Sequence, residues 1–185
     1  VLDSLARTNS LFPENYSSLS EEEKLTALCK LQPEKPVSAF DNDTDKDAIE
    51  TMQAIRSIQS YNGEQGCNPY IISQCNSALN VMEVFALFKL RGWTTSKINI
   101  DIVPLFETIA DLKSASNIMK QLYENEAYFS HLKRREKKQT IMLGFSDGTK
   151  DGGYLMANWS IYKAKEELTK ISKEFDICNA DFAKQ

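Results

Sequence analysis

Charged side chains follow two apolar runs of the sequence at the point where each run ends. Residues 140–145 form an almost unbroken apolar run, and Asp147 and Lys150 come shortly after it. Residues 98–106 form a second run, which Glu107 follows directly. Both runs have the length of a strand, and the first is typical of a strand buried on both faces. Parallel α/β folds build their sites at the carboxyl ends of strands, so Glu107, Asp147 and Lys150 are candidate site residues.

The chemistry available to these three side chains is the binding of a divalent cation and an anion. Neighbouring parallel strands are about 4.8 Å apart, so Glu107 and Asp147 could share one hard cation. Mg²⁺ takes one or two protein carboxylates and leaves its other positions to water and substrate phosphate. The competing interpretation is that each residue is an ordinary cap, turn or surface charge. A phosphate-binding P-loop is excluded, because Gly144 and Lys150 do not have its spacing.

The elements that must position these residues alternate along the chain. A further strand is expected at 70–73, and helices are expected at 78–90, 115–123 and 127–132. Residues 146–153 are expected to form a loop, and an amphipathic helix follows it. Strand–helix alternation without hairpin signals predicts a helix-rich α/β fold with a parallel sheet. The side chains expected on the inward stripe of the last helix are Leu155, Trp159, Tyr162, Leu168, Ile171 and Phe175.

Residues 1–60 are expected to be a helical N-terminal part. Ser20 begins a capping-box pattern at the start of a short helix. Pro33 and Pro36 predict an extended linker after that helix. Another helix is expected after the acidic segment 41–47, and its expected inward-facing residues are Ala48, Met52, Ile55 and Ile58.

The acidic segment 41–47 has the composition of a calcium loop but not its pattern. An EF-hand loop that opens at Asp41 needs Gly at its sixth position and Glu at its twelfth, where the sequence has Lys46 and Met52. We therefore interpret the segment as the solvated start of the helix that follows it.

Three other features are assigned no role in catalysis. The basic run at 133–138 is interpreted as a solvated face, with a phosphate site as the alternative. His131 stands next to this run without an Asp, Cys or Ser partner at motif spacing. Trp93 and Trp159 are interpreted as packing residues.

Composition excludes several classes of protein. The 185 residues carry a net charge of −4, which argues against a nucleic-acid surface. No apolar segment approaches the length of a membrane span, and no signal-peptide pattern opens the chain. We therefore expect a cytoplasmic protein without nucleic-acid or membrane partners. Its cysteines form no C-x-x-C pair and are expected to be reduced thiols; they are Cys29, Cys67, Cys75 and Cys178.

Several stretches of the sequence resemble one enzyme family. The stretch 141–153, IMLGFSDGTKDGG, resembles the signature of phosphoenolpyruvate carboxylase, usually written M-x-G-Y-S-D-S-x-K-D-x-G. The segment 103–108, VPLFET, and the strand 70–73, YIIS, are similar to further blocks of that family. The helix that follows the signature in this chain, at 158–167, also resembles the helix that follows it in the family. The resemblance is collinear over most of the chain.

The resemblance implies a fold, an activity and roles for three residues. The family is an (α/β)₈ barrel, so the chain is expected to form part of a TIM-type barrel with about three parallel strands and flanking helices. Family members condense phosphoenolpyruvate with bicarbonate, giving oxaloacetate and phosphate with Mg²⁺ or Mn²⁺. Glu107 and Asp147 fall on the metal ligands, and Lys150 falls on the signature lysine near the bicarbonate and phosphate.

The sequence also departs from the family. Phe145 and Gly148 stand where the family usually has tyrosine and serine, and 78–80 replaces a Pro-Ser-Asp segment. The family's catalytic histidine and its F-H-G-R-G-G arginine loop are not found, and 178–185 does not match the family. We therefore expect a central fragment of the carboxylase in which strand–helix units occupy 61–177.

This fragment is expected to be inactive alone and to be a homo-oligomer. Two alternatives stay open at this point. The chain could be a non-catalytic module that retains the barrel core, or it could belong to another barrel enzyme that handles phosphoenolpyruvate.

Overall fold

The computed structural model describes residues 1–9, 13, 15–31, 37, 39–93, 98–177 and 179–184. The chain divides into two compact units. The first contains Val1–Asn68 and Met82–Asn99, and the second contains Pro69–Val81 and Ile100–Gln185. The expected linker at Pro33 and Pro36 lies outside the described residues, as does Cys178.

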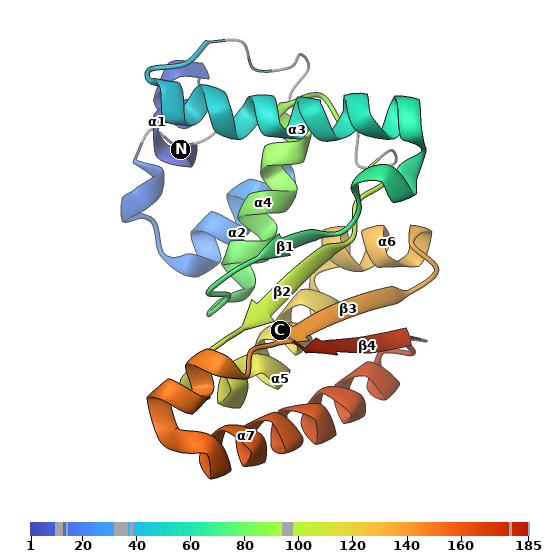
Figure 1. Ribbon diagram of the computed structural model, residues 1–185. Helices are drawn as coiled ribbons and strands as arrows, with labels where there is room; N and C mark the ends of the chain where they lie inside the picture. Colours follow the sequence, from blue (N-terminus) through green and yellow to red (C-terminus); the bar gives the residue numbers. More distant parts are fainter. Residues whose placement is uncertain are drawn as a thin grey trace. The chain divides into compact units, whose positions relative to one another are not determined.

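The first unit is built from helices, as expected for the N-terminal part (Figure 1). The predicted capping box at Ser20 is confirmed, since its side chain accepts from the Glu23 amide and the Glu23 carboxylate accepts from the Ser20 amide. Trp93 is buried against Phe88 in an edge-to-face contact, which confirms it as a packing residue. The elements of this unit are α1 (Leu2–Asn9), η1 (Tyr16–Ser18), α2 (Glu21–Lys30), α3 (Asp43–Asn62), η2 (Glu64–Cys67) and most of α4 (Ala78–Leu90).

The acidic segment forms the start of α3, as expected. Asn42 is the N-cap, and its side chain accepts a hydrogen bond from the Asp45 amide at 2.9 Å. The expected inward face was wrong in part: Ile58 is 38% exposed and Ala48 is half-buried. The apolar side chains that α3 buries are Ile49, Met52 and Ile55.

The second unit contains a parallel sheet of four strands in the order β1-β2-β3-β4. The predicted α/β class with a parallel sheet is confirmed. Three strands fall on the expected runs, and the fourth pairs with β3 through the segment that was expected to be an unmatched tail. The strands are β1 (Tyr70–Ile72), β2 (Ile102–Phe106), β3 (Lys138–Leu143) and β4 (Asn179–Lys184).

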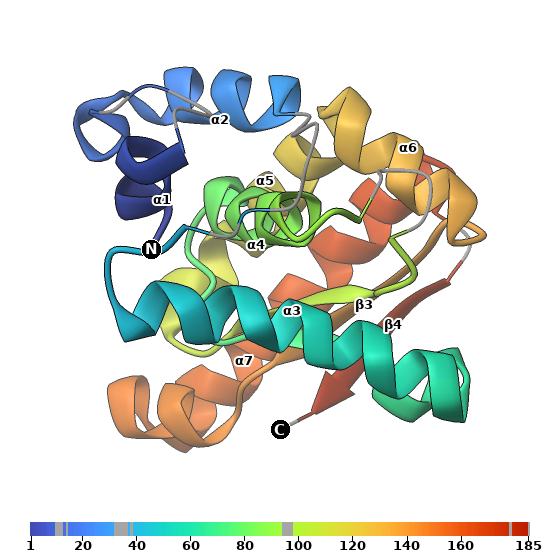
Figure 2. The ribbon, with the colours of Figure 1, turned by 90° about the horizontal axis from the view of Figure 1, so that it is seen from above.

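Each strand lies beside the one that precedes it in the chain, and helices connect the strands. The β2–β3 connection contains α5 (Ile109–Glu124) and α6 (Glu126–Arg134), and the β3–β4 connection contains α7 (Ser146–Glu174). Helices α5 and α7 pack against each other and lie on one side of the sheet (Figure 2). Sequential parallel strands with helices on one face are the arrangement found in the wall of an (α/β)₈ barrel.

Burial differs between the two central strands. Every residue of β2 is buried. Along β3, buried residues alternate with half-buried or exposed ones, so the expectation that this strand is buried on both faces was wrong. Its core-facing residues are Gln139, Ile141 and Leu143.

The helix α7 differs most from its prediction. It begins at Ser146, so the expected loop at 146–153 is largely a helical turn, which ends at Gly153 with φ 80°. The inward stripe was correct at Leu168 but wrong at Leu155, Trp159 and Tyr162, which are 82%, 56% and 58% exposed. The interpretation of Trp159 as a packing residue of the core was therefore wrong. Most of the side chains that α7 buries are small instead, and the helix packs against α5. The buried residues of α7 are Gly148, Ala157, Ser160, Ile161, Ala164, Leu168 and Ser172.

Two further observations bear on the sequence expectations. Cys67 and Cys75 are free thiols, as expected. Among the helices of the described ranges, none is both long and apolar enough to cross a membrane.

Candidate functional site

Glu107 is the first residue after β2, at the carboxyl edge of the sheet, where this fully buried strand ends. Its Oε2 atom accepts a hydrogen bond from the backbone N–H of Gln74 at 2.7 Å. Gln74 follows β1 and has φ 51°, a left-handed conformation that is uncommon for a residue with a Cβ. This backbone geometry aims the Gln74 amide at the carboxylate and thereby fixes one oxygen of Glu107.

Asp147 and Lys150 lie on the helical turn 146–152, which follows β3 directly. The Lys150 ammonium donates to Oδ1 of Asp147 at 2.9 Å. The hydrogen bond to the Asp147 carboxylate and the charge of that carboxylate raise the pKa of Lys150. Both side chains are accessible to solvent, at 43% for Asp147 and 77% for Lys150, so the pair is an exposed one.

Two glycines bring this turn against the end of β2. A Cβ added to Gly144 would lie 2.9 Å from the Cα atom of Glu107, so no larger residue fits there without a backbone shift. A Cβ on Gly148 would lie 3.5 Å from the Glu107 carbonyl oxygen, which is an ordinary contact. The peptide next to Asp147 therefore packs on the peptide of Glu107, and both carboxylates belong to the carboxyl edge of the sheet.

Carboxylate oxygens are the type of ligand that a small hard cation prefers. One oxygen of each carboxylate has a protein donor, and the second oxygen of each has no hydrogen-bond partner among the described residues. In that same part of the chain, no group of three or more His, Cys, Asp or Glu side chains could hold a metal. Two carboxylates match the number that Mg²⁺ ordinarily takes from a protein. Glu107 and Asp147 are therefore the residues that could hold such an ion.

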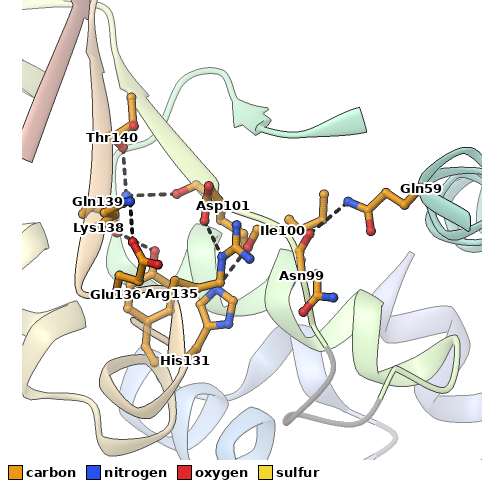
Figure 3. A network of polar contacts seen from close by, with 12 residues as sticks. Gln59, Asn99, Ile100, Asp101, His131, Arg135, Glu136, Lys138, Gln139 and Thr140 are labelled. Atoms are coloured by element: carbon orange, nitrogen blue, oxygen red, sulfur yellow. Dashed lines mark hydrogen bonds and ion pairs between the residues drawn. The ribbon is translucent and has the colours of Figure 1, made fainter. Parts of the chain in front are cut away.

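The basic run lies at the opposite, amino-terminal edge of the sheet, and acidic partners neutralise most of it. Arg135 donates to Asp101 at 2.7 Å, and Lys138 pairs with Glu136 (Figure 3). Lys137 pairs with Asp176. These pairs support the interpretation of a charged surface over that of a phosphate site.

His131 lies in the core beneath that edge. It is 1% exposed, and its Nε2 atom is 3.0 Å from the carbonyl oxygen of Ile100 (Figure 3). Burial lowers the pKa of His131 to about 4, and the positive charges of Arg134 and Arg135 act in the same direction. A buried, neutral imidazole at the edge of the sheet away from Glu107 and Asp147 agrees with the expectation that His131 has no catalytic role.

Two residues near the carboxylates were not identified from the sequence. Gln74 acts through its backbone amide, and no side-chain pattern signals such a donor. Asp151 accepts a hydrogen bond from the backbone N–H of Ile109 at 3.1 Å. Asp151 also falls on the aspartate that follows the lysine in the quoted signature, and that position could have indicated it.

Comparison with known proteins places these residues in a family. A sequence model of the phosphoenolpyruvate carboxylase family matches residues 1–179. Phosphoenolpyruvate carboxylase of Trichormus variabilis is 34% identical over 198 aligned residues, covering 90% of this chain and 19% of that protein. The enzyme of Thermosynechococcus vestitus is 34% identical, covering 95% of this chain and 18% of that protein.

A third relative gives the same result. Phosphoenolpyruvate carboxylase of Corynebacterium diphtheriae is 34% identical, covering 89% of this chain and 19% of that protein. The chain thus spans about a fifth of the length of the curated relatives that it matches. The family match extends over both compact units and includes Glu107, Asp147 and Lys150. The chain belongs to the phosphoenolpyruvate carboxylase family.

Proposed function

We propose that this chain provides the metal-binding edge of a phosphoenolpyruvate carboxylase, with Glu107 and Asp147 as ligands of Mg²⁺ or Mn²⁺ and Lys150 as a catalytic cation. The observation that carries the proposal is the packing of the turn 146–152 on the end of β2. There the carbonyl oxygen of Glu107 lies 3.5 Å from the position of a Cβ on Gly148, next to Asp147. The family match supports it, because the same residues lie in the stretches that resemble the family's signature blocks.

The side chains of the edge have separate tasks in this proposal. Glu107 is held by the Gln74 amide, so one of its oxygens keeps a fixed direction. Asp147 is exposed enough to meet a ligand from solvent. Lys150 has a long, mobile stem and is 77% exposed, so it can leave Asp147 and pair with an anionic reactant. Bicarbonate and the phosphate of phosphoenolpyruvate are such anions.

The bound cation would supply compensation for the negative charge of phosphate and enolate oxygens. The protein as a whole would carboxylate phosphoenolpyruvate with bicarbonate to give oxaloacetate and phosphate. We extend the proposal to a cytoplasmic homo-oligomer whose sheet forms part of an (α/β)₈ barrel. The open order of the sheet supports further pairing at its edges, because β1 and β4 are its outer strands and an outer strand presents a backbone edge.

We expect the 185-residue chain alone not to turn over phosphoenolpyruvate. Stabilising the charge on a transferring phosphate takes several cationic groups, and loss of one donor costs roughly 10²–10³ in rate. The chain places Lys150 at this edge, whereas its single histidine is buried elsewhere. Oxaloacetate formation above background in a malate-dehydrogenase-coupled assay would refute this expectation.

Metal binding tests the site itself. Titration of the purified chain with Mn²⁺, followed by the decrease of the free-ion electron paramagnetic resonance signal, should show weak binding that Asp147→Ala removes. Asp176→Ala is the matched control, because Asp176 is also a carboxylate paired with a lysine but lies at the other edge of the sheet. Phosphoenolpyruvate should tighten the binding, since substrate phosphate fills positions that water otherwise holds. Equal binding by wild type and Asp147→Ala would place the site elsewhere.

A further inference from the structure

The helical turn 146–152, which carries Asp147 and Lys150, is a short segment between two glycines. It follows β3 at Gly144, whose amide donates to the Phe106 carbonyl at 2.8 Å. At its other end, Gly153 has φ 80° and ψ 164°, so the helical backbone is interrupted before the long part of α7 begins. The direction of the turn therefore depends on contacts made between these two glycines.

Asp151 makes such a contact with the start of α5. Its Oδ2 atom accepts a hydrogen bond, at 3.1 Å, from the backbone N–H of Ile109, the first residue of that helix. The amides of a first helical turn have no acceptor within the helix. The capping box of α5, formed by Thr108 and Asp111, serves the amides of those two residues and leaves that of Ile109. A carboxylate is also favoured at the positive end of a helix.

Gly152 brings the same two segments into contact beside this hydrogen bond. A Cβ at Gly152 would lie 2.0 Å from the Cδ1 atom of Ile109, so the Ile109 side chain packs on the backbone of the turn at a position without a side chain. Ile109 is two residues beyond Glu107 in the chain. A bond to the Ile109 amide thus ties the turn of Asp147 to the segment that carries Glu107.

We propose that Asp151 is a positioning residue of the carboxylate site: it holds the turn of Asp147 and Lys150 against the strand end of Glu107 by capping α5. The inference rests on the proposed function, because it concerns the geometry of the same carboxylate pair. Asp151 acts here through its acceptor oxygen and not as a further ligand of the cation.

Two variants separate these roles. Asp151→Asn keeps an acceptor oxygen for the Ile109 amide but loses the charge, whereas Asp151→Ala loses both. Two readouts are needed for each: the Mn²⁺ dissociation constant, and hydrogen exchange at the Ile109 and Thr149 amides without metal. Thr149 reports on the turn itself, because its amide donates to the Phe145 carbonyl at 3.0 Å.

We expect Asp151→Ala to weaken Mn²⁺ binding about tenfold, as is typical when a residue that orients a metal ligand is lost. Exchange at both amides should accelerate in the same variant. Asp151→Asn should stay within about threefold of wild type, well short of that loss, with exchange at Ile109 preserved. Equal losses in the two variants would mean that the charge matters and not the hydrogen bond, and would overturn the proposal. Unchanged binding and exchange in Asp151→Ala would also overturn it.

The two proposals fail in different ways. If wild type and Asp147→Ala bind Mn²⁺ equally, the metal site is wrong, and the exchange rates then decide whether Asp151 holds the turn. If Asp147→Ala abolishes binding while Asp151→Ala leaves it unchanged, the metal site stands and the positioning role is refuted.

Discussion

Acidification should destabilise the sheet-containing unit through His131, the single histidine of the chain. Its imidazole is 1% exposed, and with the proton on Nε2 it donates to the Ile100 carbonyl at 3.0 Å. Burial, supported by the charges of Arg134 and Arg135, lowers its pKa to about 4 from the ordinary 6.5. The unfolded chain therefore takes up a proton near pH 6.5, and the folded chain takes it up only near pH 4. The free energy of unfolding should be highest above pH 6.5 and fall as the pH decreases toward 4.

The size of the effect follows from the two pKa values of His131. A difference of this size corresponds to about 3 kcal/mol of unfolding free energy in total, of which about 2 kcal/mol is lost between pH 7 and pH 5. Urea unfolding of the wild type and of His131→Gln at pH 7 and at pH 5 measures this loss of unfolding free energy. The variant should be less stable at pH 7, but its loss on acidification should be about 2 kcal/mol smaller.

Nuclear magnetic resonance gives an independent check, because one histidine gives one imidazole signal. The signal should titrate near pH 4. A midpoint near 6.5, or parallel pH profiles of the wild type and the variant, would refute the reasoning.

Two further predictions concern the framework of the site. Gly144→Ala should destabilise the chain by about 1–3 kcal/mol in thermal unfolding, because its Cβ meets the backbone of Glu107 at 2.9 Å, whereas Gly148→Ala, at 3.5 Å, should have little effect. Equal losses in the two glycine variants would contradict this assignment of close contact. Thr108→Ala should cost about 1 kcal/mol in urea unfolding, because it removes the oxygen that accepts from the Asp111 amide. Thr108→Ser should keep that stability, and an unchanged Thr108→Ala variant would show that this cap contributes nothing.

The strands of the site were predictable because each run is mainly apolar over the length of a strand. The runs 98–106 and 140–145 lead to β2 and β3, and the charged residues that follow lie at one edge, as parallel strand ends must. The capping box at Ser20 was predictable for a similar reason, since it needs only residues within one turn. Features decided by local sequence were thus predicted well.

Other features depend on neighbours that are distant in sequence. The segment Asn179–Lys184 has no apolar run and forms β4 through pairing with β3. In α7, apolar periodicity favoured Leu155 and Trp159 as buried residues, but the helix, which packs against α5, buries small side chains such as Ala157 and Ala164 instead. Side-chain size against a particular partner decided this face, and a single sequence does not specify that partner.

The carboxylate site combined predictable and unpredictable parts. Its charged residues were identified from their positions after strands. The Gln74 amide, which holds Glu107, depends on a backbone with φ 51°, and that geometry has no sequence signal. The hydrogen bond from Ile109 to Asp151 depends on a helical turn where two glycines favoured a loop.

Paramagnetic broadening by Mn²⁺ tests the central claim most directly, because it locates the ion residue by residue. In the ¹⁵N-labelled chain, the amides of Gln74, Gly144 and Gly148 should lose intensity first, since they pack on or donate to Glu107. The amide of Lys138, at the other end of β3, should be preserved, and Asp147→Ala should remove the pattern. Broadening centred on the acidic segment 41–47, or a pattern that survives Asp147→Ala, would contradict a metal site formed by Glu107 and Asp147.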